Sequence, residues 1–275
     1  PKLLGAYIYL VFPSVGATEN IIMAASLSEG ETVIENAAVE PEVIDLVNFL
    51  NQMGASVFCV GNGTIKVTGV KKLHGAVYTV IPDRIEAGTF MAAAAITGGD
   101  ITLKNAVYEH IKPAAAKLAE CGMAVEETEN GIHVYPVGKR KAFNIKTMPF
   151  PGFPTDMQAI FMSVMTISKG TSIVTETVFE NRFLQADELK RMGADIKTEG
   201  RVAVVEGVRK LTGAKVNAPD LRAGAALIVS ALAAEGQTEI GEIQHIDRGY
   251  SHIDEKLRRL GAHIKRIEEE KEGKK

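Results

Sequence analysis

Acidic and basic residues recur around the predicted starts of helices. A proline followed by a Ser, Thr or Asp precedes each of four apolar stretches, at Pro13-Ser14, Pro82-Asp83, Pro154-Thr155-Asp156 and Pro219-Asp220. Ser, Thr and Asp are preferred N-cap residues, so helix capping, worth about 0.5–2 kcal/mol, is the plainest interpretation of each. Arginines stand in comparable places, at Arg182, Arg222 and Arg248. One such arginine would indicate only a weak surface ion pair.

Several arginines at the positive ends of helices form a site for phosphates or carboxylates. An ionised Asp among them could accept a proton from a substrate hydroxyl. The sequence contains no His-x-x-x-His, Cys-x-x-Cys, Gly-x-Gly-x-x-Gly after a strand, or Walker loop. We therefore predict a site for a multiply charged anion with acid–base chemistry, and no cofactor or metal.

An internal repeat must position these residues. One pattern of helix, glycine, strand, amphipathic helix, glycine and strand occurs four times, and the glycine ending the second helix falls at Gly54, Gly122, Gly193 and Gly261. The spacings of 68, 71 and 68 residues suit one αβαβ-type unit and are too long for a solenoid repeat. The first helix of each unit is apolar almost all round, which predicts burial inside a ring of sheets. The second is amphipathic and should lie outside.

In the first copy the expected elements follow from local signals. Helices are predicted over 14–28 and 40–53, and a strand over 32–34. A hairpin of 57–60 and 64–70 should turn at Gly61-Asn62-Gly63. A last strand is expected over 76–81, before the next helix. The fourth copy should end in the strand His263-Ile264-Lys265-Arg266-Ile267.

The two cysteines are expected to be structural. Cys121 occupies the position held by Met53, Met192 and Leu260 in the other copies, which is a core position. Cys59 stands in an apolar strand and is an equally poor candidate for a nucleophile.

Composition narrows the class of protein. The 275 residues are 46% hydrophobic with a net charge of −3, and two cysteines do not suggest a disulfide framework. We predict a soluble, cytoplasmic α/β protein that binds neither nucleic acid nor membrane. Residues 2–8 match the strand that precedes later units, so the sequence reads as a fragment of a longer chain.

Particular phrases resemble a known family, the UDP-N-acetylglucosamine enolpyruvyl (1-carboxyvinyl) transferases. They are residues 13–20, 34–38, 82–90, 153–158, 180–183, 220–224 and 245–250. The resemblance implies an inside-out α/β barrel of repeated βαβαββ-type units, four of the family's six being present. Residues 1–81 would be the last third of a first domain and 82–275 a second domain of three units.

The resemblance also implies the reaction and its residues. Enolpyruvate would pass from phosphoenolpyruvate to the 3′-hydroxyl of UDP-N-acetylglucosamine, releasing phosphate, in the first committed step of peptidoglycan synthesis. By this resemblance the catalytic residues would be Asp156 as the base for the hydroxyl, Asp220 in proton transfer, and Arg222 and Arg248 as clamps for phosphoenolpyruvate. Substrate contacts would come from Phe12, Pro13, Ser14, Val15, Gly16, Glu40, Thr155, Asp156, Val178, Phe179 and Arg182.

The chain departs from the family where the reactive cysteine loop should be. Neither Cys59 nor Cys121 matches that cysteine, so the isolated chain is expected to be inactive, with the missing N-terminal portion as a candidate partner. Two alternatives remain. One is a truncated, non-catalytic module that binds the nucleotide sugar, and the other is an enzyme like 5-enolpyruvylshikimate-3-phosphate synthase.

Overall fold

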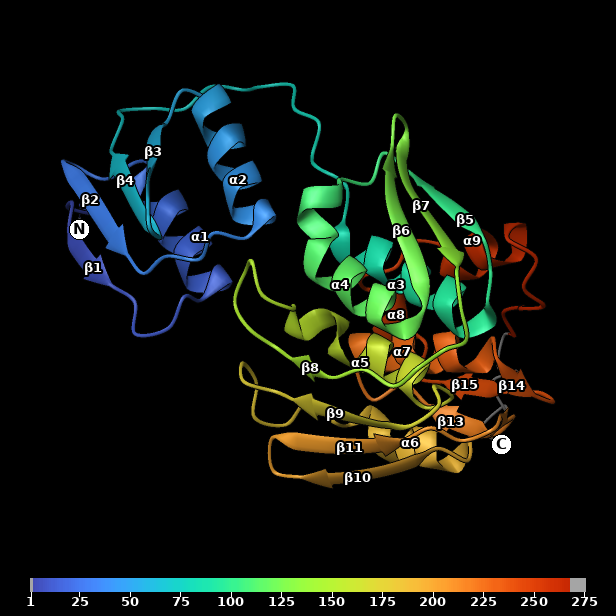
Figure 1. The fold of residues 1–275 in the computed structure, drawn as a ribbon. Helices are drawn as coiled ribbons and strands as arrows, with labels where there is room; N and C mark the ends of the chain where they lie inside the picture. The colour runs from blue at the N-terminus through green and yellow to red at the C-terminus, as the bar shows by residue number, and fades with distance from the viewer. Residues whose placement is uncertain (1, 268–275) are drawn as a thin grey trace, which may run out of the picture.

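A computed structural model describes residues 2–267. Figure 1 shows a small N-terminal part beside a larger C-terminal part, joined by a long irregular segment. The N-terminal part contains β1 (Tyr7–Tyr9), α1 (Val15–Ala25), β2 (Glu31–Glu35), α2 (Pro41–Gln52), β3 (Ser56–Gly61) and β4 (Thr64–Thr68). The C-terminal part begins with α3 (Arg84–Thr97), β5 (Ile101–Lys104), α4 (Tyr108–Cys121), β6 (Met123–Thr128) and β7 (Gly131–Pro136).

The C-terminal part continues with two further groups of elements. The first is β8 (Ile145–Lys146), α5 (Thr155–Met165), β9 (Thr171–Thr175), α6 (Gln185–Arg191), β10 (Asp195–Glu199) and β11 (Val202–Glu206). The second is β12 (Leu211–Thr212), β13 (Lys215–Asn217), α7 (Leu221–Ala231), β14 (Ala234–Glu235), β15 (Glu239–Gly241), α8 (Gln244–Asp247) and α9 (Ile253–Arg259).

The predicted repeat is confirmed by the sheets. The first copy has the strand order β1-β2-β4-β3, and the third has the same order, β8-β9-β11-β10. In both, the first pair is parallel and the others are antiparallel. The helix-ending glycines Gly54, Gly122, Gly193 and Gly261 all have φ between 90° and 102°. This left-handed conformation is cheap only for glycine, which explains why glycine recurs at this point.

The large core confirms the predicted layering. Helices α3, α5 and α7 pack against one another at the centre, and the sheets surround them (Figure 1). Their side chains are buried almost all round, as in α5, where every residue from Met157 to Met165 is buried. The outer helix α4 buries one stripe, made of Ile111, Ala114, Ala115, Leu118 and Cys121. The arrangement is an inside-out α/β barrel.

The small core is separate. Ile22, Ile34 and Val43 belong to a cluster of buried residues that lies wholly between residues 22 and 67. The large cluster begins at Ile85. Helix α1 buries only Thr18, Ile22 and Ala25, because it packs against α2, β2 and β4 of its own copy and not among α3, α5 and α7.

The strand expected over 76–81 is not formed. The equivalent strands β1, β8 and β13 each pair with the second strand of their unit, but residues 76–81 lie against α2 instead. Gln52 Nε2 donates to the carbonyl of Val77 at 2.9 Å, and the hydroxyl of Tyr78 donates to Asp45 Oδ1 at 2.6 Å. Side chains of α2 therefore take the place of a neighbouring strand.

The prediction of a strand over residues 263–267 is also wrong. Its counterparts β3, β6 and β10 are each held by an antiparallel hairpin partner. Within residues 2–267 the fourth copy has no such partner, and 262–267 carry no regular structure. Strand-like sequence alone does not stabilise an unpaired strand.

Candidate functional site

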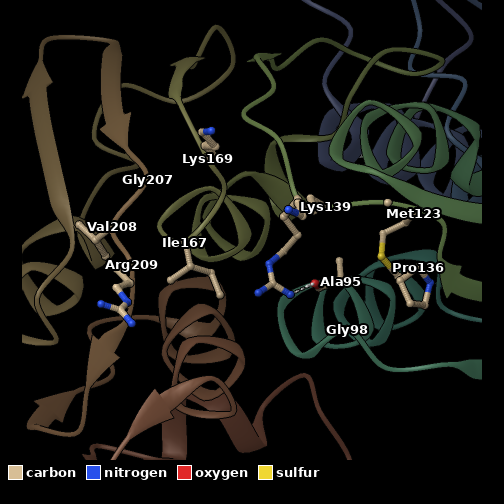
Figure 2. Close-up of a pocket in the computed structure, with 12 residues that line it drawn as sticks. Ala95, Gly98, Met123, Pro136, Lys139, Ile167, Lys169, Gly207, Val208 and Arg209 are labelled. Carbon is tan, nitrogen blue, oxygen red and sulfur yellow. Dashed lines mark hydrogen bonds between the residues drawn. The ribbon is translucent and has the colours of Figure 1, made fainter.

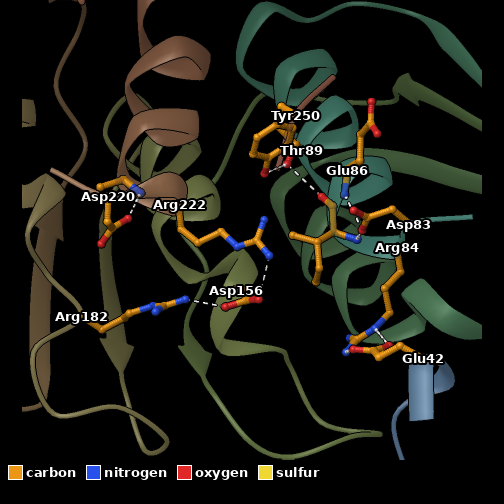
Figure 3. Close-up of polar contacts among 12 residues, drawn as sticks. Glu42, Asp83, Arg84, Glu86, Thr89, Asp156, Arg182, Asp220, Arg222 and Tyr250 are labelled. Carbon is orange, nitrogen blue, oxygen red and sulfur yellow. Dashed lines mark hydrogen bonds and ion pairs between the residues drawn. The ribbon is translucent and has the colours of Figure 1, made fainter. Parts of the chain in front are cut away.

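Asp156 lies between two arginines at the start of α5. Its Oδ2 accepts a hydrogen bond from Arg222 Nη2 at 2.8 Å, and its Oδ1 is bonded to Arg182 Nη2 (Figure 3). The two arginine side chains are 17% and 18% exposed, whereas that of Asp156 is 36% exposed. One carboxylate shared by two guanidinium groups leaves a net positive charge facing solvent. An anionic group could therefore bind beside an ionised carboxylate.

Arg222 is held from its other side by Tyr250. The guanidinium carbon of Arg222 lies 6.0 Å from the centroid of the Tyr250 ring, and the Tyr250 hydroxyl is 2.8 Å from Thr89 Oγ1. Burial would lower the pKa of Arg222, but the charge of Asp156 outweighs it and raises this pKa above its usual value. Burial raises the pKa of Tyr250, so its phenol stays protonated at neutral pH. Arg222 is thus a fixed cation.

Arg182 is positioned by an aromatic ring as well as by Asp156. Its guanidinium carbon lies 4.7 Å from the centroid of the Phe179 ring, a cation–π geometry. The Nε of Arg182 is buried and has no hydrogen-bond partner among the described residues. Phe179 itself is 49% exposed, which leaves one face of the ring free to contact a bound molecule.

The capping interpretation is right for two of the three acidic candidates and wrong for Asp156. Asp83 and Asp220 are N-caps whose side chains accept from Ile85 N at 2.7 Å and Ala223 N at 2.8 Å. In α5 the N-cap is Pro154, without a side-chain cap bond. The carboxylate of Asp156 is therefore not used to cap the helix.

Glu176 organises the neighbouring residues and was not anticipated. It is 1% exposed, and its Oε1 accepts from Thr147 Oγ1, Val178 N and Phe179 N at 2.8–3.0 Å. Its Oε2 accepts from Thr155 Oγ1 at 3.0 Å. A lone acid after an apolar strand gave no signal in the sequence, because its donors come from three separate segments. Glu176 fixes three of the residues implied by the resemblance.

The N-terminal part contributes Glu40 and Glu42 to this region. Glu40 is buried, and its Oε1 accepts from the backbone N of Phe150 at 3.3 Å. Glu42 receives two hydrogen bonds from Arg84, at 3.1 and 2.8 Å. Figure 3 draws this pair in the same close-up as Asp156. Burial raises the pKa of Glu42, but its bonds to Arg84 outweigh this, so the pKa lies below its usual value.

The loop predicted to bind the diphosphate precedes α1 and supplies its helix cap. Ser14 is the N-cap, and its Oγ accepts from Ala17 N at 3.3 Å. Phe12 and Gly16 are exposed, and Pro13 and Val15 are half-buried. Within the described residues, no hydrogen bond or ion pair joins residues 12–16 to Asp156, Arg182 or Arg222.

Arg248 differs from the expectation that it begins a helix. It follows the short α8 as its C-cap and is exposed, with no ion pair in residues 2–267. Its neighbour Asp247 is instead bonded to Arg266. Tyr250, two residues further on, is the part of this loop that contacts Arg222. The structure therefore brings Asp156, Arg182 and Arg222 together and leaves Arg248 outside the group.

Cys121 is fully buried in the large core, as predicted for a core position. Cys59 lies in β3 and is exposed. Burial raises the pKa of each thiol, which disfavours the thiolate that a nucleophile needs. Between residues 2 and 267 no group of three or more His, Cys, Asp or Glu side chains has metal-binding geometry. None of the helices between residues 2 and 267 combines the length and the hydrophobicity that a membrane-spanning helix needs.

The inside-out barrel is the fold of the enolpyruvyl transferases. A crystal structure of the enolpyruvyl transferase NikO from Streptomyces tendae superposes with a TM-score of 0.85 at 27% identity, over 96% of this chain and 66% of that one. EPSP synthase from Acinetobacter baumannii shares the fold, with a TM-score of 0.75 at 21% identity over 97% of this chain and 64% of that one.

The family follows from the sequence match. The family model for EPSP synthase (3-phosphoshikimate 1-carboxyvinyltransferase) matches residues 1–257, and the chain belongs to this family. The chain is 60% identical over 265 residues to UDP-N-acetylglucosamine 1-carboxyvinyltransferase 1 of Caldanaerobacter subterraneus subsp. tengcongensis, covering 96% of this chain. It is 58% identical over 268 residues, 97% of this chain, to UDP-N-acetylglucosamine 1-carboxyvinyltransferase of Finegoldia magna. The resemblance drawn from the motifs is confirmed.

The chain is shorter than these relatives. It spans 64% of the length of the Caldanaerobacter protein and 63% of that of the Finegoldia protein.

Proposed function

We propose that the chain takes part in the transfer of enolpyruvate from phosphoenolpyruvate to the 3′-hydroxyl of UDP-N-acetylglucosamine, with release of phosphate. This is the reaction of peptidoglycan synthesis for which the relatives at 57–60% identity are named. The observation that supports it most strongly is the carboxylate of Asp156 held between Arg182 and Arg222. Both substrates are multiply charged anions, and the acceptor must lose a proton.

In the proposed step Asp156 accepts the proton of the 3′-hydroxyl. The hydroxyl oxygen forms a bond to C2 of the enolpyruvyl group, and the bond from C2 to the phosphate oxygen breaks. Arg222 and Arg248 would bind the negatively charged groups of phosphoenolpyruvate. Asp220 would act in proton transfer at a carbon atom of phosphoenolpyruvate. Asp220 caps α7 with Oδ1, so its other oxygen is the one available for that role.

The nucleotide sugar would bind across both parts of the molecule. We propose contacts from Phe12, Pro13, Ser14, Val15, Gly16 and Glu40 of the N-terminal part, and from Thr155, Asp156, Val178, Phe179 and Arg182 of the C-terminal part. Backbone amides at the start of α1 suit a diphosphate. The ring of Phe179 offers an exposed apolar surface. We assign residues 1–81 and 82–275 to two domains, in keeping with the two separate cores.

The reaction needs more than these 275 residues in this proposal. The relatives are longer, and neither Cys59 nor Cys121 suits a reactive thiol. We propose that an N-terminal portion carrying the reactive cysteine completes the site, either as a separate chain or joined to this one. The cytoplasm is the proposed compartment, since both proposed substrates are metabolites of that compartment.

The test combines binding and turnover. Calorimetric titration with UDP-N-acetylglucosamine should show binding to the chain, and phosphate release should require addition of a separately expressed N-terminal portion. Binding without turnover under all conditions would favour a non-catalytic nucleotide-sugar module. Binding of shikimate 3-phosphate instead of the nucleotide sugar would favour the EPSP synthase reaction, which the description of the family model names.

A further inference from the structure

A second basic site lies at the opposite end of the buried helices. The cavity measures about 550 Å³, within the range of small-molecule sites, and four cations line it: Lys139, Arg140, Lys169 and Arg209 (Figure 2). It adjoins the C-terminal ends of α3 and α5, whose N-terminal ends face Asp83 and Asp156. At 1.5 Å per residue these helices are about 21 and 16 Å long, so this cavity is distinct from the candidate site.

The internal repeat shows that this concentration of charge is not required by the fold. The same register recurs in three copies, as the pairs Leu4↔Glu29, Lys141↔Lys169 and Thr212↔Glu235. A lysine stands two residues before the first member of each pair, at Lys2, Lys139 and Lys210. Lys2 forms an ion pair with Glu29, and Lys210 forms one with Glu235. In the copy with Lys141↔Lys169, the matching pair is Lys139 and Lys169, two like charges.

Local groups do not balance this charge. Each helix C-terminus carries about half a negative charge, so α3 and α5 offset about one of the four cations. The cation offset in this way is Arg140, because its Nη1 donates to the carbonyl of Ala95 in the last turn of α3 at 3.3 Å. No carboxylate lines the cavity, and none of the four cations has an ion pair within residues 2–267. The other three cations, Lys139, Lys169 and Arg209, are exposed to solvent and available to an anionic ligand.

The remaining lining indicates what that ligand is. Met123, Pro136, Ile167 and Val208 form an apolar surface beside the cations. Lysine and arginine bind phosphate groups through charge-assisted hydrogen bonds, and an apolar surface accommodates an organic moiety. We infer that this cavity binds an organic anion with two or more phosphate groups, of the size of a nucleoside diphosphate. The inference is independent of the proposed function.

The repeat supplies the variant that tests it. Lys169→Glu recreates the Lys–Glu pair found in the other copies, so the fold and its melting temperature should be retained. ADP is the probe and adenosine its uncharged control. Charge-assisted bonds contribute about 1.5–3 kcal/mol, so the dissociation constant for ADP should rise about tenfold or more in Lys169→Glu.

Two matched variants locate the binding. Lys197→Glu makes the same charge change on the exposed face of β10 and should alter the ADP affinity by less than about twofold. Arg182→Gln alters the candidate site and should also leave ADP binding within about twofold. An unchanged ADP affinity in Lys169→Glu, no ADP binding at millimolar concentration, equal binding of adenosine, or loss of ADP binding only in Arg182→Gln would each overturn the inference.

Discussion

Asp156 and Arg222 are 66 residues apart in the chain, and their side chains are joined by a hydrogen bond of 2.8 Å. The bond links the starts of α5 and α7, two helices that pack side by side in the large core. The carboxylate is thereby aimed across the end of the barrel and not at its own helix terminus. This geometry distinguishes Asp156 from Asp83 and Asp220, which cap their helices.

The first prediction concerns Asp156→Asn. An amide cannot accept the hydroxyl proton, so phosphate release in the complemented reaction should fall about 10²-fold or more. Nucleotide-sugar binding should change far less. Since Asp156 forms no cap bond, the loss of stability should come from its two arginine contacts and from its charge in the first turn of α5. Turnover equal to that of the parent would show that Asp156 is not the base.

The second prediction separates Arg222 from Arg248. Lysine keeps the charge but loses the planar fork that contacts both Asp156 and Tyr250. Arg222→Lys should therefore lower the free energy of unfolding by about 1–2 kcal/mol. Arg248→Lys, at an exposed position, should change it by less than about 0.5 kcal/mol. Denaturant titration measures both.

The proposed clamp adds an effect on substrate. Both lysine variants should weaken phosphoenolpyruvate binding or slow turnover while the fold persists. Unchanged kinetics in both would remove these arginines from the proposed anion site.

The third prediction is that Glu176→Gln disturbs the candidate site through positioning. Glutamine keeps one acceptor oxygen for Thr147, Val178 and Phe179, but that oxygen is no longer charged, and its amide nitrogen forces the Thr155 hydroxyl to change from donor to acceptor. A hydrogen bond to a neutral acceptor contributes about 1 kcal/mol less than one to a charged acceptor. We expect a lower free energy of unfolding together with weaker UDP-N-acetylglucosamine binding.

Thr171→Val is the matched control for that variant, because it removes an exposed bond to Glu206 on the same sheet. It should leave nucleotide-sugar binding unchanged. If Glu176→Gln destabilises the chain but binds the sugar normally, its role is purely structural.

The fourth prediction uses the ion pair between Glu42 and Arg84. The Arg84 side chain is 9% exposed and that of Glu42 is 42% exposed, so removal of the arginine should cost about 1–3 kcal/mol, less than for a fully buried pair. The pKa of Glu42 is lowered in the folded state. Its contribution is therefore present above the unfolded value, near 4.3, and is lost as the pH falls through the folded pKa.

The difference in stability between the parent and Arg84→Gln should accordingly be full at pH 7 and shrink below about pH 4. Unfolding curves at pH 7, 5 and 3.5 measure it. A difference that stays constant over this range would show that the pair does not link the two parts energetically.

The fifth prediction is that limited proteolysis cuts within about ten residues of Pro82. Residues 69–83 have no regular structure, and Val77 and Val80 are 93% and 72% exposed. Such a segment opens at little cost in free energy. A stable C-terminal piece containing the large core should accumulate, detectable by mass spectrometry. Initial cleavage within α3, α5 or α7 would contradict the division into two domains.

The repeat, the order of the elements and the layering of the large core could be predicted from the sequence. These depend on local properties: glycine where a helix needs a left-handed residue, apolar side chains all round the inner helices, and Pro with Ser, Thr or Asp before their starts. Local conformational preferences and hydrophobic periodicity depend only on residues close together in the sequence, so they can be predicted from it. The sequence motifs also identified the correct family. The predictions of strands over 76–81 and 263–267 were wrong, because a strand needs a hydrogen-bonding partner and β-propensity does not specify one.

Which charged groups contact one another could not be predicted from the sequence and depends on the tertiary structure. Asp83 and Asp220 directly follow a proline and Asp156 follows one after Thr155. Only Asp156 is shared by two arginines, and Arg248 lies outside this group. The role of Glu176 and the Lys139–Lys169 pair were likewise not predicted, because each depends on contacts between segments about 30 residues apart in the sequence. Side-chain partners depend on contacts between distant segments, and a buried charge is stabilised by whichever donors the packing delivers to it.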